Sequence, residues 1–455
     1  MKVVEIIENP EANEPFVDLG EKKSISCEDV AFIALEIGEH IQRSGGEIGR
    51  VEDTIKRICK AYGAIHVDVF ALTSIIILSV NFGDRTFTRT RRITKGGVNN
   101  FSKLAKLNQL SREVCSTCPP KEGVIEKMQE ITNKTQHVLP LFLLAHVLTA
   151  LGFCMYFGGS MIESLVAGFI ALLMYVLHRI ISGPHMNVIM AKLIICFFGG
   201  LSTVLVTFIG NSYCGLTLHS DLIMIGTIMN VIPGVAFTNS LRDLLGGDLM
   251  TGILRLSEVL IDTVAIAGGY AMSLLLLKNI ANTTTTVQEA TPEMILYRFI
   301  GAMICTFGLT LLYNLEWRSI TFAMIGAAIA CLIFEIYIYM FANVFVGALL
   351  AAMAVAAYSD IIAHIIKTPT TILLIPGIVP MVPGGLLFRA MLALLDKEAE
   401  SASDYGSRAL FVSMGITIGI LAATFVFRTL WSSIEKFKQN KEHKFSNIID
   451  KIKKV

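Results

Sequence analysis

The sequence predicts a polytopic α-helical membrane protein with about ten transmembrane helices in two inverted five-helix repeats and an N-terminal cytosolic α+β domain. Three observations predict this fold. The 455-residue chain is 53% hydrophobic and only 16% charged, whereas soluble domains carry roughly 25% charged residues. Its apolar residues gather after residue 137 in runs long enough to span a membrane. A Pro-Gly break followed by an arginine occurs once in each half of this apolar region.

The part of the chain before residue 137 predicts a tail and a domain. Residues 1–24 are expected to form a flexible tail, and no cleavable signal is visible because the first residues are acidic and lack an apolar segment. Residues 25–136 are expected to form the cytosolic α+β domain. Helical periodicity covers residues 27–46, 46–63, 99–115 and 122–135, and strand-length runs that predict an antiparallel sheet cover residues 65–72, 74–82 and 85–94.

The apolar runs predict five spans in residues 137–278, an external loop over residues 279–294, and five spans in residues 295–431. The runs are Val138–Phe157, Met161–Leu177, Ala191–Ile209, Leu218–Phe237, Val259–Leu277, Ile295–Tyr313, Ile320–Phe334, Ile338–Tyr358, Thr370–Leu395 and Ala409–Phe427. Lys and Arg gather before the first span and in the basic tail over residues 432–455, so both termini are expected in the cytoplasm. Because five is an odd number, related halves would insert with opposite orientations. Shared apolar composition is the alternative reason for their likeness.

Each Pro-Gly break lies inside an apolar span. The first break is Pro233-Gly234, followed by Thr238, Asn239 and Arg242, and the second contains Pro380, Pro383 and Gly384, followed by Arg389. Proline removes a backbone donor, so these spans cannot be continuous helices. Non-helical backbone persists at membrane depth only where it is buried in protein or lines a cavity. Paired broken helices are typical of the substrate sites of secondary transporters.

Four motifs resemble those of a known family. In chain order they are SGGEIGRVEDTIKRICKAYG, TRTRRI, LNQLSREV and VIPGVAFTNSLRDLLGGDLMTGILRLSE, and together they resemble the threonine/serine exporter family of bacterial inner membranes. The resemblance covers nearly the whole chain, in the form that fuses the soluble domain and both membrane halves. It implies a multi-pass secondary exporter of threonine or serine in the bacterial inner membrane. Export of C4-dicarboxylates such as succinate is the alternative, because relatives with separate chains are associated with it.

A transported carboxylate requires a guanidinium, a helix N-terminus or hydroxyls as partners inside the membrane. Both breaks offer such groups, so the expected substrate-binding residues are Pro233, Gly234, Thr238, Asn239, Arg242, Pro380, Pro383, Gly384 and Arg389. Two alternatives stay open. Arg242 could pair with Asp243 or extend to the cytoplasmic interface, and Arg389 could lie at the membrane edge.

A proton gradient is the expected energy source, because the chain has no phosphate-binding loop that would indicate ATP hydrolysis. Glu258 and Asp262 are the candidate proton carriers. They follow Arg255 at positions i+3 and i+7, so the three side chains share one helix face. An interfacial pair of Arg255 with Glu258 is the alternative. A channel also stays open as a class.

The protein is not expected to be an enzyme, and a membrane-anchored metabolite sensor or hydrolase is the alternative from another class. The site of that alternative would consist of the polar residues Arg50, Glu52, Asp53 and Arg91, and a solvated helix surface with a basic strand near anionic lipid also explains these residues. No serine elbow or metal-spaced histidine cluster is visible, so neither a cofactor nor a metal is expected, and the lone pair Cys115 and Cys118 is more typical of a turn. A net charge of +1 argues against a nucleic-acid partner. The expected partners are the lipid bilayer and a small carboxylate-bearing metabolite, and a homo-oligomer is left open.

Overall fold

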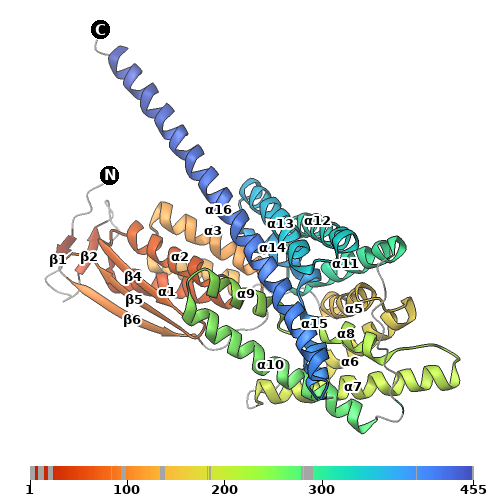
Figure 1. The fold of residues 1–455 in the computed structure, drawn as a ribbon. Helices are drawn as coiled ribbons and strands as arrows, with labels where there is room; N and C mark the ends of the chain where they lie inside the picture. The colour runs from red at the N-terminus through yellow and green to blue at the C-terminus, as the bar shows by residue number, and fades with distance from the viewer. Residues whose placement is uncertain are drawn as a thin grey trace.

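The computed structural model describes residues 6–8, 15–18, 24–83, 85–93, 99–133, 139–181, 183, 186–277, 280, 291–395 and 397–452. An α+β unit lies at one end of the molecule and adjoins a bundle of long helices (Figure 1). The expected external loop over residues 279–294 lies mostly outside the described residues.

The α+β unit contains two three-stranded antiparallel sheets and four helices. The strands are β1 (Ile6–Glu8), β2 (Pro15–Asp18) and β3 (Ser24–Ser26) in one sheet, and β4 (His66–Ala71), β5 (Ile75–Asn81) and β6 (Thr86–Arg92) in the other. The helices are α1 (Cys27–Arg43), α2 (Ile48–Ala61), α3 (Phe101–Thr117) and α4 (Lys121–Asn133). The first two strands fall where the sequence predicts a flexible tail. Strands this short leave too few alternating positions for a sequence pattern to reveal them.

Helix α1 forms the centre of this unit. Its N-terminus is capped by the Ser26 hydroxyl, which accepts a hydrogen bond from Asp29 N at 3.0 Å. Ile33, Ile37 and Ile41 recur every four residues, so they share one face, and all three are fully buried. This face packs against α2, α3 and β5. The unit therefore has its own apolar core.

The remaining helices form two sets with the same order of elements. The first set is α5 (Leu139–Tyr156), α6 (Met161–Ile181), α7 (Val188–Tyr213), α8 (Ser220–Ile228), α9 (Gly234–Leu245) and α10 (Leu249–Leu276). The second set is α11 (Pro292–Leu312), α12 (Trp317–Phe341), α13 (Val344–Ile366), α14 (Thr370–Ile378), the 3₁₀ turn η1 (Val379–Met381), α15 (Gly384–Leu395) and α16 (Ala399–Ile452). In both sets, the fourth element is broken and the other elements are continuous.

Eight of the described helices are long and apolar enough to cross a membrane, and the bent pair formed by α14 with η1 and α15 makes a ninth. The chain is therefore a multi-pass helical membrane protein. The described count is lower than the ten spans expected, because α8 and α9 have only 9 and 12 residues and are separated at Met229–Pro233. The boundary expected between Phe334 and Ile338 is wrong. Helix α12 continues through it to Phe341, since Glu335 is buried in an ion pair rather than exposed in a loop.

The same helix pairings occur in both sets. Helix α7 packs against α10, and α13 packs against α16, so the third and fifth elements are neighbours in each set. The sets also exchange contacts, since α9 packs against α16 and α15 packs against α10. The two broken elements are thus each held against the last helix of the opposite set.

Helices α5 and α11 join the two sets through closely approaching backbones. A Cβ atom added at Gly152 would lie 2.3 Å from Cys305 N, and one added at Gly308 would lie 2.7 Å from Thr149 N. One added at Gly301 would lie 2.7 Å from Tyr156 N. Small residues permit such approach between membrane helices. The pairings also show that α5 and α11 run antiparallel.

The α+β unit is fixed to one end of the bundle. Phe101 N donates a hydrogen bond to Tyr313 O at 2.9 Å, just after the end of α11. Arg242, near the end of α9, pairs with Glu47 of the α+β unit at 3.4 Å. Because α5 runs antiparallel to α11, the loop that follows α5 lies at the opposite end of the bundle, away from this unit.

Candidate functional site

The two Pro-Gly breaks meet inside the bundle. A Cβ atom added at Gly234, the first residue of α9, would lie 2.6 Å from Val382 Cγ1 and 3.7 Å from Gly384 Cα. Gly384 is the first residue of α15, and its own added Cβ would lie 2.8 Å from Ile232 Cγ2. The non-helical segment of the second break has fewer residues than the spacing of its prolines predicts, because Pro376 lies inside α14 and Pro380 lies inside η1. The bend of 44° follows at Val382 and Pro383.

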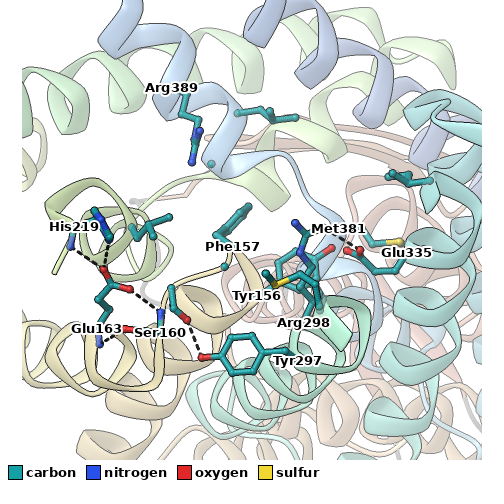
Figure 2. A pocket seen from close by; sticks show the side chains of 18 of the residues that line it. Tyr156, Phe157, Ser160, Glu163, His219, Tyr297, Arg298, Glu335, Met381 and Arg389 are labelled. Carbon is teal, nitrogen blue, oxygen red and sulfur yellow. Dashed lines mark hydrogen bonds and ion pairs between the residues drawn. The ribbon is translucent and has the colours of Figure 1, made fainter. Parts of the chain in front are cut away.

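A cavity of about 1000 Å³ lies beside this crossing, at the bundle end away from the α+β unit. Its walls come from the loops after α5 and α7, the start of α11, the end of α12, the second break, α15 and the start of α16. Figure 2 shows the labelled wall residues Tyr156, Phe157, Ser160, Glu163, His219, Tyr297, Arg298, Glu335, Met381 and Arg389. The cavity thus joins elements of both sets.

Glu163 fixes one wall of the cavity. Its carboxylate accepts hydrogen bonds from Ser160 N at 2.6 Å, from His219 N at 2.7 Å and from His219 Nδ1 at 2.8 Å. The Ser160 hydroxyl in turn accepts from Glu163 N at 3.3 Å, which completes a capping box at the start of α6. The side chain is 2% exposed, while that of His219 is 32% exposed and faces the cavity. A buried carboxylate therefore holds an imidazole that water can reach.

Arg298 and Glu335 form a second charged pair in the wall. Arg298 Nη1 donates to Glu335 Oε2 at 3.2 Å, and the two side chains are 17% and 5% exposed. The pair links α11 to α12. Removing either partner would leave a buried charge unpaired, which is costly at membrane depth.

Arg389 is a cation of the cavity that has no acidic partner. Its guanidinium lies 6.0 Å from the centre of the Tyr405 ring, and it makes no ion pair with a carboxylate of the described residues. Figure 2 shows its side chain extending from α15 toward the space between the Glu163 and Glu335 pairs. Arg408 also lines the cavity, but its Nε donates to Asp404 Oδ1 at 3.0 Å. Arg389 is therefore available to an anion in the cavity.

The expected residues of the second break line this cavity, and those of the first break do not. Pro380, Pro383 and Arg389 are wall residues, and Gly384 begins α15 next to them. Pro233 and Gly234 lie where the first break meets the second, with Gly234 next to Val382 and Gly384. Thr238 is buried, its carbonyl accepting from Thr417 Oγ1 at 3.5 Å, and Asn239 is half-buried.

Arg242 lies at the α+β unit rather than at the cavity. It pairs with Glu47, not with its neighbour Asp243. Asp243 Oδ2 instead accepts from Arg255 Nη1 at 2.5 Å. The sequence could not indicate Glu47 as the partner because the two residues are far apart in the chain.

The expected proton carriers also lie outside the cavity walls. Asp262 Oδ2 accepts from Lys192 Nζ at 2.6 Å, which joins α10 to α7, and Glu258 is exposed on the same helix. Arg255 does not form the pair with Glu258 that the sequence left open, since Asp243 binds it. The structure thus places Glu258 on the exposed side of α10 and Asp262 between α10 and α7, and it brings other acids into the cavity walls.

The polar residues expected in one site of the α+β unit are divided. Arg50 and Asp53 line a common cavity. Glu52 instead accepts a hydrogen bond from Ala71 N at 2.9 Å, and Arg91 donates to Glu39 Oε2 at 2.5 Å and also pairs with Glu36. The latter two residues therefore stabilise the unit itself.

The cysteines of the α+β unit are held as thiols. Burial raises the pKa of Cys59 to about 12, and it also raises the pKa of Cys115 and of Cys118. Cys118 Sγ donates to Ala61 O at 3.3 Å. Within the part of the chain that the structure describes, no three His, Cys, Asp or Glu side chains gather in a way that could hold a metal ion.

Sequence reasoning missed four wall residues, Glu163, His219, Arg298 and Glu335. Glu163 lies near the start of the apolar run Met161–Leu177, and Glu335 directly follows the run Ile320–Phe334, so the sequence places both acids near span ends. One signal was visible, because Ser160 and Glu163 have the spacing of a capping box before an apolar run. Nothing local marks the other partners, since each pair joins two different helices or loops.

A bundle of membrane helices whose two broken elements cross beside a charged cavity defines a multi-pass membrane transport protein. Comparison with family models gives the particular family. The family model described as "Putative threonine/serine exporter" matches residues 32–277, and the model described as "Threonine/Serine exporter, ThrE" matches residues 298–426. The chain belongs to the threonine/serine exporter family.

Two relatives agree with this assignment. The threonine/serine exporter of Corynebacterium glutamicum is 21% identical over 423 residues, which cover 91% of this chain and 85% of that protein. A protein of Mycobacterium tuberculosis named a probable threonine/serine exporter is 23% identical over 413 residues, which cover 87% of this chain and 76% of that protein. No solved structure matches the chain.

Proposed function

We propose that this protein exports threonine and serine across the bacterial inner membrane by secondary active transport, and that the cavity beside the two breaks is the substrate site. Arg389 is the observation that carries the proposal. It faces a cavity at membrane depth without a carboxylate partner, and guanidinium groups bind carboxylates through paired, charge-assisted hydrogen bonds.

The charges around the cavity favour an amino acid over a dicarboxylate. An amino acid zwitterion presents one carboxylate and one ammonium group. Arg389 supplies a partner for the carboxylate, while the carboxylates of Glu163 and Glu335 lie in the same walls as partners for the ammonium group. A second substrate carboxylate would instead meet these acids, and like charges repel.

The proposed topology has ten spans in two inverted repeats. Helices α8 and α9 together form the fourth span, and α14 with α15 forms the ninth. The matched pairings of α7 with α10 and of α13 with α16 support a relation between the sets. Ten spans place both termini and the α+β unit in the cytoplasm, with Lys and Arg concentrated there. The cavity then opens to the outside, which is the state that releases an exported substrate.

External labelling of Cys214 tests this topology. Of the nine cysteines, Cys214 is the exposed one, and it lies directly after α7 at the cavity end of the bundle. A membrane-impermeant maleimide added to intact cells is expected to label the protein, and Cys214→Ser is expected to remove the label. Labelling only after the cells are permeabilised would mean that the cavity end faces the cytoplasm and that the orientation is reversed.

Proton coupling is proposed to involve His219. A histidine imidazole can take up and release a proton, and here Glu163 accepts a hydrogen bond from Nδ1 of His219. The other charged residues in the walls of the same cavity are Glu293, Arg298, Glu335, Arg389 and Arg408. A proton taken up from outside after substrate release would return inward as the cavity closes. Glu258 and Asp262 remain the alternative carriers, although neither lines the cavity.

His219→Gln is expected to abolish the stimulation of threonine efflux by external acid, because glutamine can still donate a hydrogen bond to Glu163 but cannot take up a proton. Exchange of labelled threonine across the membrane should persist, since exchange requires no net proton movement. Efflux from proteoliposomes with imposed pH gradients measures both. Glu258→Gln is the control and should keep the stimulation; if it loses the stimulation and His219→Gln keeps it, the carrier lies on α10.

Uptake by inverted vesicles tests the substrate assignment itself. Inverted vesicles containing the protein are incubated separately with external labelled threonine, serine or succinate under an imposed proton gradient. Accumulation of threonine and serine against their gradients, with no accumulation of succinate, is expected. Accumulation of succinate alone would overturn the substrate class, and equilibration without accumulation would indicate a channel.

A further inference from the structure

A second cavity, with several charged residues in its walls, lies at the opposite end of the bundle, between the α+β unit and the membrane helices. Its volume is about 780 Å³, and its walls come from α2, α3, α13, the start of α14, and α16. A neighbouring cavity of about 770 Å³ lies within the α+β unit and shares Arg50 and Arg112 with it. These two arginines therefore stand at the boundary between the two parts of the protein.

Arg50, Arg112 and Lys367 line this cavity and make no ion pair with a carboxylate of the described residues, while Asp360 lies within electrostatic range of Arg50 and His364. Arg50 Nε is buried and has no hydrogen-bond partner among the described residues. Arg112 and Lys367 are more exposed. His364 lies in the same wall. Three positive charges thus border one space.

Two nearby arginines, in contrast, form ion pairs. Arg57 pairs with Asp53 at 2.9 Å, and Arg242 pairs with Glu47 at 3.4 Å. The carboxylate in the cavity wall is Asp360, which accepts a hydrogen bond from Thr370 Oγ1 at 2.8 Å. One carboxylate cannot neutralise three cations. Burying the polar atoms of a cation without a partner is unfavourable, so the cavity favours an anion that would complete it.

We infer that this cavity binds a small anion through a carboxylate or a phosphate group held by Arg50 and Arg112, with Lys367 adding charge at the rim. Guanidinium groups suit both chemistries because their planar N–H groups can bind two oxygens at once. Two sources supply such a group at a cytoplasmic face: the carboxylate of an amino acid approaching the bundle, or a phosphate.

The site is placed to link the α+β unit to both broken elements. The cavity is lined by Thr368, Pro369 and Thr370, which lead into α14. The chain continues from the C-terminal end of α14 through the second break to Arg389 in α15. Glu47 lines the neighbouring cavity and holds Arg242 of α9. An anion between Arg50 and Arg112 therefore contacts the α+β unit and the start of α14 at the same time.

Binding to the full-length protein in lipid nanodiscs tests the site. Isothermal titration calorimetry is performed with inorganic phosphate and, separately, with threonine. The double variant Arg50→Gln, Arg112→Gln is expected to weaken binding of whichever anion occupies the site at least about tenfold, because it removes charge-assisted hydrogen bonds. Lys367→Gln, an exposed change that leaves the core intact, should weaken it about threefold in the same direction. Arg57→Gln is the control, since Arg57 borders the neighbouring cavity but is paired.

The outcomes separate the two sources. Phosphate binding that is lost in the double variant and kept in both Arg57→Gln and Arg389→Gln assigns the site to a phosphate. Two threonine sites, one lost in Arg389→Gln and the other in the double variant, assign it to the carboxylate of the amino acid. If neither anion binds in a manner that depends on Arg50, Arg112 and Lys367, or if Arg57→Gln weakens binding equally, the inference is wrong. Threonine efflux that depends on Arg389 would stand in either case.

Discussion

Arg389→Gln is expected to lower threonine efflux at least about 30-fold, because truncating one partner of a desolvated charge pair costs about 2–5 kcal/mol. The guanidinium faces the cavity and has no carboxylate partner among the described residues, so its loss leaves the substrate carboxylate without a counter-charge. Glutamine keeps much of the side-chain length, which limits any effect on folding. Initial rates of efflux from cells preloaded with labelled threonine, at equal membrane abundance, measure the change.

Arg408→Gln is the matched control for this variant. Arg408 also lines the cavity, but Asp404 binds it and its side chain is 52% exposed. An exposed pair contributes about 0–1 kcal/mol, so efflux should change less than about fivefold. Equal losses in the two variants, or an unchanged rate in Arg389→Gln, would remove Arg389 from the substrate site.

Gly152→Ala is expected to destabilise the protein by about 3 kcal/mol, at the upper end of the usual cost of overpacking. The added methyl group would lie 2.3 Å from Cys305 N and 2.7 Å from Gly301 O, and these backbone atoms cannot move without separating α5 from α11. Since these two helices join the two sets, the midpoint temperature of thermal unfolding of the purified protein in detergent should fall by many degrees.

Gly268→Ala provides the comparison. Gly268 lies in α10, and a Cβ atom added there meets nothing within 4 Å. Alanine is favoured over glycine in a helix by about 1 kcal/mol, so this variant should be as stable as the parent or slightly more stable. Equal behaviour of the two alanine variants would show that α5 and α11 are not in direct backbone contact.

The broken spans could be predicted from the sequence because proline and glycine act locally. Pro233-Gly234 and Pro383-Gly384 mark their own positions, and each does begin a new helix. That Gly234 and Gly384 lie next to each other could not be predicted, since no pattern along the chain relates them. The family motifs indicated transport but not which charges face the cavity.

The partners of the charged residues were the part that the sequence could not supply. Arg242 has the position expected of a substrate residue one turn after a break, yet Glu47 of the α+β unit binds it. Glu335 interrupts an apolar run, so the sequence pattern predicts a loop between Phe334 and Ile338. Glu335 is instead a helical residue, because Arg298 offsets the cost of burying its charge. The partner of each buried charged residue depends on which helices become neighbours in the folded protein.

Helix α16 continues without interruption for 54 residues from Ala399 to Ile452, and Figure 1 shows its end projecting well beyond the bundle. At 1.5 Å per residue it is about 80 Å long, more than twice the hydrocarbon thickness of a bilayer. It begins at the cavity end and packs against both broken elements, α9 and α15. Because of this length, a tilt of about 5° at the cavity end would displace the far end by about 7 Å. If opening and closing of the cavity tilt α16, a distance probe at its C-terminal end would follow each transport cycle as a large displacement.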